Sequence, residues 1–209
     1  REGIHQMVEL QNDRYYYIAM MNEAYQQPAM PQRENIERDI IKGMYLLEEE
    51  QGDHKLKVQL MGSGTILLEV REAAKILREE FGIGADVWSV TSFNELRRDG
   101  LEVERWNRLH PRETERLSHI EECLNGREGP VVASTDYMKL FADQIRMWVP
   151  QSNYVELGTD GFGRSDSRKR LRDFFEVDRY WVTVAALQGL VKEGKLDVQV
   201  VVDAMAKFG

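Results

Sequence analysis

The sequence predicts a three-layer αβα fold of the α/β class, built on a five-stranded, mostly parallel sheet with one antiparallel strand. Three strand-like apolar runs are each followed by a helical pattern, which is typical of βα units in a largely parallel sheet. Apolar residues make up 42% of the 209 residues and charged residues 31%, so the chain has the composition of a globular protein that buries a full core.

Five segments are expected to form the strands. The short turn QGDHK joins the first to the second, and we expect the first strand to run antiparallel to its neighbour, because a parallel pair needs a longer crossover. The segments are MYLLEEE from Met44, KVQLMGSG from Lys57, ADVWSVTS from Ala85, GPVVASTDY from Gly129 and NYVELG from Asn153.

Helical patterns fill most of the sequence between and after these strands. NIERDIIKG predicts a short helix with Asn35 as its cap, and Gly82 can end the helix that follows the second strand. FNELRRDG and Glu102 to Leu109 are expected to be two separate helical stretches, and MKLFADQIRMWV another. A final helix is expected to start at an Asp197 cap. Two apolar stripes at helical spacing mark buried faces: Ile66, Val70, Ala73, Ala74 and Leu77, and Val182, Ala185, Ala186, Leu190 and Val191.

The first residues are expected to belong to a different domain. Their apolar run YYYIAMM has the composition of a buried strand, and such a strand needs neighbours that this end of the sequence does not supply. QQPAMPQ, from Gln26 to Gln32, contains two prolines and predicts an extended linker. We therefore expect a domain boundary here and a chain that is part of a longer polypeptide.

Composition excludes several classes of function. A net charge of -8 and a pI near 5.2 argue against non-specific binding to nucleic acid, which needs a basic face. No segment approaches the roughly 18 apolar residues of a membrane span. Cys123 is the single cysteine, which excludes an internal disulfide and favours a reducing, cytoplasmic compartment. We expect its thiol to be buried or idle rather than a nucleophile.

Two glycine-rich loops are candidates for phosphate binding. In the Gly62 to Gly64 loop, Leu67 stands where a dinucleotide-binding fingerprint has its third glycine, so a tight turn is favoured over a nucleotide site. In the Gly158 to Ser165 loop, Asp160 and Asp166 would repel a phosphate, whereas Arg164 and Arg168 would attract one.

We therefore expect the second loop to be constrained and to pack against another domain or subunit, with Ser165 capping the next helix. Whether it also binds a ligand stays open. The candidate interface residues are Asp160, Gly161, Phe162, Gly163, Arg164 and Ser165.

The remaining polar and aromatic residues suggest no assembled catalytic centre. The four histidines form no short metal-ligand pair, and His110, before a proline, is expected to be a loop residue. The basic run RSDSRKRLRD is expected to be a solvated helix face, with a docking patch for an acidic partner as the alternative. Trp148, Trp181, Phe174 and Phe175 are expected to be core or interface anchors. No catalytic, cofactor-binding or metal-binding residue is assigned.

Six stretches are similar to one known family. They are NEAYQQPAMP, VQLMGSGTILLEVREAAKIL, VWSVTSFNELRRDG, RWNRLHP, VVASTDYMKLFADQIR and LGTDGFGRSDSRKRLRDFFEVD. In this order, over nearly the whole chain, they resemble the C-terminal region of the homodimeric bacterial pyruvate dehydrogenase E1 components, which are transketolase-like enzymes that depend on thiamin diphosphate. GTDGFGRSDSR and VASTDYMKLFA favour this family over transketolase itself.

The resemblance implies that residues 1–28 are the tail of the middle, aminopyrimidine-binding domain with a linker, and that residues 29–209 are a transketolase-like C-terminal domain. It implies a cytoplasmic parent enzyme that decarboxylates pyruvate with thiamin diphosphate and Mg²⁺. That enzyme transfers the two-carbon unit to a lipoyl group on the E2 dihydrolipoyl acetyltransferase. The implied partners are the rest of the E1 chain, a second E1 subunit and E2.

The family's catalytic and cofactor-binding residues belong to segments outside this sequence. The chain alone is therefore expected to be inert, to bind no cofactor, and to complete the subunit and its dimer interface. Gln26 stands where relatives often carry histidine. Two alternatives remain: a small enzyme with a nucleotide site at Gly62 to Gly64, and an interaction module that docks an acidic partner through Arg164 to Arg172.

Overall fold

The computed structural model describes residues 1–21, 24–151 and 153–208. Within them, five strands form one sheet in the order β1-β3-β2-β4-β5, in which β1 is antiparallel to β3 and the other pairs are parallel. This confirms the predicted sheet. The strands are β1 (Met44–Glu48), β2 (Lys57–Ser63), β3 (Gly84–Val90), β4 (Val131–Ser134) and β5 (Tyr154–Leu157).

The direction of β1 was predicted correctly, but its expected neighbour was wrong. β1 pairs with β3, with Met44 opposite Val90, whereas β2 lies on the other side of β3. QGDHK is therefore not the turn of a hairpin: residues 49–56 carry the chain past β3 to the next place in the sheet. A short connection excludes a parallel neighbour, but it does not require that the two strands pair.

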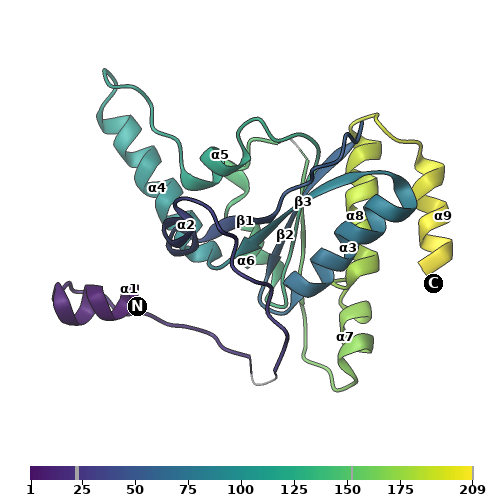
Figure 1. Cartoon of the computed structure of the whole chain (residues 1–209), viewed down its shortest axis with the longest axis horizontal. Coiled ribbons are helices and arrows are strands. Elements are labelled where there is room, and N and C mark those ends of the chain that lie inside the picture. The colour runs from purple at the N-terminus through teal and green to yellow at the C-terminus, as the bar shows by residue number, and fades with distance from the viewer. Residues whose placement is uncertain (22–23, 152, 209) are drawn as a thin grey trace.

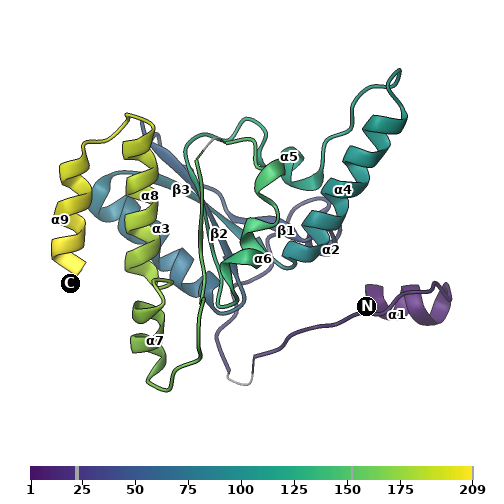
Figure 2. The ribbon, with the colours of Figure 1, turned by 180° about the vertical axis from the view of Figure 1, so that it is seen from behind.

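Helices cover both faces of the sheet and give three layers (Figures 1 and 2). One buried cluster joins the sheet to α4, α5 and α6, and a second joins it to α3, α8 and α9. The helices of the domain are α2 (Ile36–Lys42), α3 (Ile66–Phe81), α4 (Phe93–Leu109), α5 (His119–Leu124), α6 (Lys139–Asp143), α7 (Arg168–Phe174), α8 (Arg179–Lys192) and α9 (Val198–Phe208), with a 3₁₀ turn at Arg146–Trp148.

The N-terminal segment differs from its prediction. Residues 14–21 form no strand, and Tyr17 is 89% exposed, so the buried strand expected from YYYIAMM is wrong for the described part of the chain. α1 (Glu2–Ile4) and a π-helical turn (His5–Glu9) precede it and lie apart from the layered domain (Figure 1). A strand needs the backbone of a neighbour, and the described residues place none beside this run.

The apolar stripes are confirmed by burial. Every member of the α3 stripe is buried, and so is every member of the α8 stripe except Val191, which is half-buried. Gly82 ends α3 with a left-handed φ of 66°, and the Asp197 carboxylate accepts a hydrogen bond from Gln199 N at 2.7 Å, both as predicted. Asn35 occupies the cap position of α2, but its side chain makes no capping hydrogen bond.

The two helical stretches expected between residues 93 and 109 are a single helix, α4. The expected division into two stretches was therefore wrong, and Gly100 lies inside the helix. A Cβ at this position would lie 2.5 Å from the Trp148 ring, so glycine is present in the helix because the indole packs directly on its backbone. Trp148 is buried, as expected of a core anchor.

We predict that Gly100→Ala destabilises the chain by about 1–2 kcal/mol in urea unfolding. The added methyl overpacks the contact with Trp148, and this cost exceeds the gain of up to about 1 kcal/mol in helix propensity. Gly163→Ala is the matched control, because a Cβ there meets no atom within 4 Å and its φ is not in the left-handed region. A Gly100→Ala variant at least as stable as the unmodified chain would contradict this account.

Candidate functional site

The strand order places a crevice at the carboxyl ends of β2 and β4. From β2 the chain crosses through α3 to β3 on one side, whereas β4 and β5 lie on the other side. In open α/β sheets such a switch in direction is where ligands bind. Thr65 follows β2, Asp136 follows β4 and Thr159 follows β5, so each strand end contributes a polar residue to this edge.

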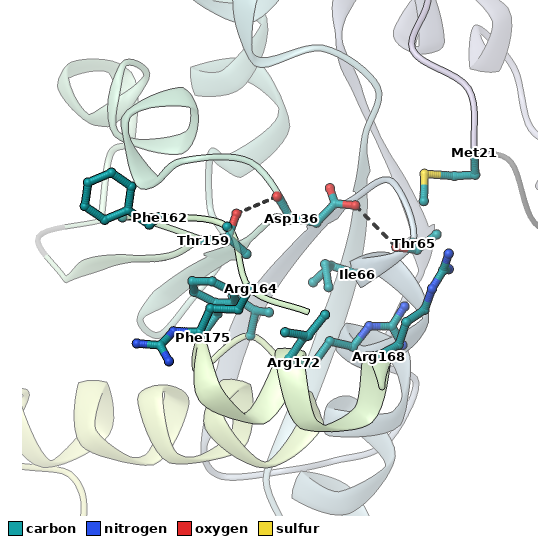
Figure 3. Close-up of a pocket in the computed structure, with 14 residues that line it drawn as sticks. Met21, Thr65, Ile66, Asp136, Thr159, Phe162, Arg164, Arg168, Arg172 and Phe175 are labelled. Atoms are coloured by element: carbon teal, nitrogen blue, oxygen red, sulfur yellow. Dashed lines mark hydrogen bonds between the residues drawn. The ribbon is translucent and has the colours of Figure 1, made fainter. Parts of the chain in front are cut away.

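A pocket of about 370 Å³ lies at this edge. Figure 3 shows Thr65, Asp136 and Thr159 on one side of the pocket and α7 on the other. Ile66, Leu171 and further apolar side chains complete the wall, and Met21 of the N-terminal segment lies at one end. The pocket is therefore largely apolar, with acidic and basic groups at its margins.

The Gly62 to Gly64 loop is the tight turn that was predicted. A Cβ on Gly62 would lie 2.7 Å from the Leu67 Cα, and Gly64 has a left-handed φ of 57°. The Asp136 carboxylate lies next to this turn, where the Thr65 hydroxyl donates to its Oδ2 at 3.4 Å. A carboxylate beside the start of α3 occupies the place that a phosphate would take, and it would repel one.

The base of the Gly158 to Ser165 loop is constrained, as predicted. Thr159 N donates to Tyr137 O at 2.9 Å, and the Thr159 hydroxyl donates to Asp136 O at 2.6 Å. Asp160 Oδ1 accepts a hydrogen bond from Lys139 N at 3.1 Å, at the start of α6. The carboxylate of Asp160 therefore lies at the first turn of α6 and accepts a hydrogen bond there.

The tip of this loop is exposed. Gly161 has a φ of 91°, which reverses the chain, and the Phe162 side chain that follows is 95% exposed. The predicted cap by Ser165 was wrong, because α7 begins at Arg168 with Ser167 in the cap position. The Asp166 carboxylate accepts a hydrogen bond from Ser167 N at 2.6 Å, just before the helix.

The basic run is not a uniformly solvated face. Arg172 Nη1 donates to Glu69 Oε1 at 2.8 Å, and Arg168 contacts the hydroxyl of Tyr25, the residue before the linker. Arg164 lies over the Phe174 ring, with its Cζ 4.2 Å from the ring centroid, and Arg170 is exposed. Among the predicted aromatic anchors near α7, Phe174 is 53% exposed, whereas Phe175 and Trp181 are half-buried.

Glu69 is the buried charge that the sequence analysis missed. It is 6% exposed and also accepts from Arg179 at the start of α8, from Nε at 2.8 Å and from the backbone N at 3.2 Å. Burial by itself raises the pKa of the Glu69 carboxyl, but the hydrogen bonds and charge of Arg179, with the charge of Arg172, hold the pKa below its ordinary value. Position 69 falls three residues after Ile66 and four before Ala73, so helical spacing alone could have placed it on the buried face.

Cys123 Sγ lies 3.6 Å from His119 Nε2, but the histidines and the cysteine belong to no metal-binding cluster in the described residues. No group of three His, Cys, Asp or Glu side chains within residues 1–21, 24–151 and 153–208 is placed to hold a metal ion. His110 stacks on Trp106 just after α4, with ring centroids 4.4 Å apart, which agrees with its prediction as a loop residue. Burial raises the pKa of the Cys123 thiol to about 12, as expected of an idle cysteine.

No helix in the described part of the chain combines the length and apolar character of a membrane span.

We predict that Glu69→Gln lowers the free energy of unfolding at neutral pH by about 3 kcal/mol, because Arg172 and Arg179 lose the charge that compensates them. The carboxyl has a lower pKa in the folded chain, so it stabilises the fold above its unfolded-state pKa of about 4.3, and this contribution is lost as the pH falls through the folded-state pKa. Urea unfolding at several pH values measures the free energy of unfolding of the unmodified chain and of Glu69→Gln. The difference between these two free energies should shrink as the pH falls below the unfolded-state pKa of the carboxyl.

The matched control is Glu72→Gln on the same helix. Its carboxylate lies 3.6 Å from Arg179 Nη1 but is 48% exposed, so its loss should change stability by less than about 1 kcal/mol. Equal effects of the two substitutions would contradict the assignment of Glu69 as the structural charge.

Comparisons with known proteins agree with this geometry. The family model described as the transketolase-like TK C-terminal domain matches residues 43–178. The chain is 66% identical over all 209 residues to the pyruvate dehydrogenase E1 component of Pseudomonas aeruginosa and 57% identical over 208 residues to that of Escherichia coli K12. It spans 24% and 23% of the length of these relatives.

The solved structures to which this chain is similar include two transketolases. The transketolase of Pichia stipitis in complex with sedoheptulose-7-phosphate has a TM-score of 0.49 and 22% identity, covering 78% of this chain and 20% of that chain. The Leishmania mexicana transketolase has a TM-score of 0.49 and 17% identity, covering 75% of this chain and 19% of that chain. The family model covers more than half of the sequence and contains all five strands, and the chain belongs to the transketolase-like C-terminal domain family.

Proposed function

We propose that this chain is the C-terminal part of a bacterial pyruvate dehydrogenase E1 component. The observation that carries the proposal is the 66% identity to a protein of that name over every residue of the chain, although the chain spans 24% of that relative. The E. coli and Cupriavidus necator proteins of the same name, at 57% and 50% identity, support it. Residues 1–28 would then end the preceding domain and residues 29–209 form the C-terminal domain.

The parent enzyme, in this proposal, decarboxylates pyruvate in the cytoplasm and passes the two-carbon unit to a lipoyl group of E2. Thiamin diphosphate and Mg²⁺ supply the chemistry in this enzyme family. The described residues do not fit these groups: Asp136 and Asp160 lie at the starts of α3 and α6, and the described chain offers no metal-binding cluster. We assign this segment a structural role and derive no catalytic step from it.

A chimera tests the assignment. When this chain replaces the matching segment of the P. aeruginosa relative, we expect the chimera to keep the decarboxylation of pyruvate, because two thirds of the replaced residues are identical. The chain alone, given thiamin diphosphate, Mg²⁺ and pyruvate, should release no carbon dioxide above background. Turnover by the chain alone, or a folded but inactive chimera, would contradict the proposal.

Within the parent enzyme, we propose that the loop Asp160–Ser165 contacts the second E1 subunit. Support comes from the contrast within the loop: its base is fixed by Thr159 and Asp160, whereas Phe162 is 95% exposed. A large aromatic ring held in water by a constrained loop is the kind of side chain that anchors protein interfaces.

The alternative of a small nucleotide-binding enzyme is not favoured, because a carboxylate lies beside each of the two glycine-rich loops.

We predict that Phe162→Ala in the full-length enzyme raises the dimer dissociation constant at least about tenfold, because a central aromatic contact typically contributes 2 kcal/mol or more. Analytical ultracentrifugation measures the constant. The same substitution should leave the unfolding of the isolated chain unchanged, since the ring packs on little of it. Met205→Ala on α9, which removes another exposed apolar side chain, is the control. An unchanged dimer with Phe162→Ala would exclude the loop tip from the interface.

A further inference from the structure

A second pocket lies between α7 and the end of the loop, and Phe162 does not line it. Its volume is about 290 Å³, and its walls are Arg164, Ser165, Asp166, Arg170, Leu171 and Phe174. We propose that this pocket docks an acidic segment of a partner polypeptide. A partner carboxylate would lie between Arg164 and Arg170, and a neighbouring apolar side chain would pack on Phe174 and Leu171. This site shares Arg164 and Ser165 with the loop that is proposed to contact the second E1 subunit, but it adds the α7 residues Arg170, Leu171 and Phe174 and does not include Phe162.

Arg164 and Arg170 both have N–H groups available to bind a carboxylate. Arg164 lies over the Phe174 ring with its Cζ 4.2 Å from the centroid, and a cation–π contact of this kind holds a guanidinium without using its N–H donors. Arg170 is 78% exposed on its side chain, and its contact with Asp166 is 3.8 Å, which is longer than a hydrogen bond. Both cations therefore keep donors for an incoming acid.

The other arginines of the run serve the fold itself. Arg172 neutralises buried Glu69, and Arg168 contacts Tyr25, the residue before the linker. In Figure 3, Arg164 points away from Arg168 and Arg172. The charge presented to a partner is therefore concentrated at Arg164 and Arg170, and Lys169 on α7 is also exposed.

Charge and surface chemistry together favour an acidic polypeptide over other anions. Between Arg164 and Asp173 there are five basic and two acidic side chains, in a chain whose net charge is -8. Nucleic acid requires an extended basic face, and this patch is one short loop and one helix of seven residues. A free phosphate would make no use of the exposed Phe174 ring, which is 53% accessible, whereas an apolar residue beside a glutamate or aspartate would cover it.

The test uses a short fluorescein-labelled peptide of glutamates interrupted by leucines, titrated with the chain and followed by fluorescence anisotropy. R164E/R170E should weaken binding at least about tenfold, because two attractive charge pairs become repulsive. R164Q/R170Q, which adds no repulsion, should also weaken it, and R164K/R170K should retain most of it. Added salt should reduce the affinity, as for exposed charges. Circular dichroism checks that each variant is folded.

R97E/R105E on α4 is the matched control, since it changes the net charge equally at exposed arginines on the far side of the sheet (Figure 1). It should leave binding unchanged. The proposal is overturned if the unmodified chain does not bind the peptide, if a glutamine version of the peptide binds as tightly, or if R97E/R105E weakens binding as much as R164E/R170E. Displacement by inorganic phosphate, but not by sodium chloride at equal ionic strength, would assign the pocket to a free phosphate and also overturn it.

Discussion

The ion cluster around Glu69 is the constraint on which the arrangement of the carboxyl edge depends. One buried carboxylate on α3 binds Arg172 of α7 and both the side chain and backbone of Arg179 at the start of α8. A buried charge is tolerated when several donors compensate it, and removing one member leaves the others uncompensated. The cluster therefore fixes the orientation of α7 against the sheet and, with it, the two pockets that α7 helps to line.

The same edge has the topology of a ligand-binding site and the chemistry of a structural one. The strand order creates a crevice at β2 and β4, but Asp136 lies beside the start of α3 and Asp160 beside the start of α6. These carboxylates take the positions where helix starts favour an anion. The chain retains the layout of an α/β enzyme while its own acids fill the places of a phosphate, which agrees with a domain that supports a parent enzyme.

The carboxylates of this edge have hydrogen-bond partners within the chain, whereas several large apolar side chains are exposed. Phe162 and Tyr17 are large side chains left almost fully in water, one on a constrained loop and the other on an extended segment. Exposed apolar surface of this kind marks interaction sites. Glu69 is thus compensated inside the domain, whereas Phe162 is exposed, and the Arg164–Arg170 pocket has charged and apolar groups at one place.

The sequence by itself determined the strands, the buried faces of α3 and α8 and the family, because these depend on local periodicity and on stretches that can be matched directly. Only the tertiary structure decided that β1 lies beside β3, that Gly100 continues α4 beneath Trp148, and that YYYIAMM stays exposed. It also decided that Glu69 and Arg172, distant in sequence, form one buried pair. Pairing between remote segments follows from packing of the whole chain, which no local pattern encodes.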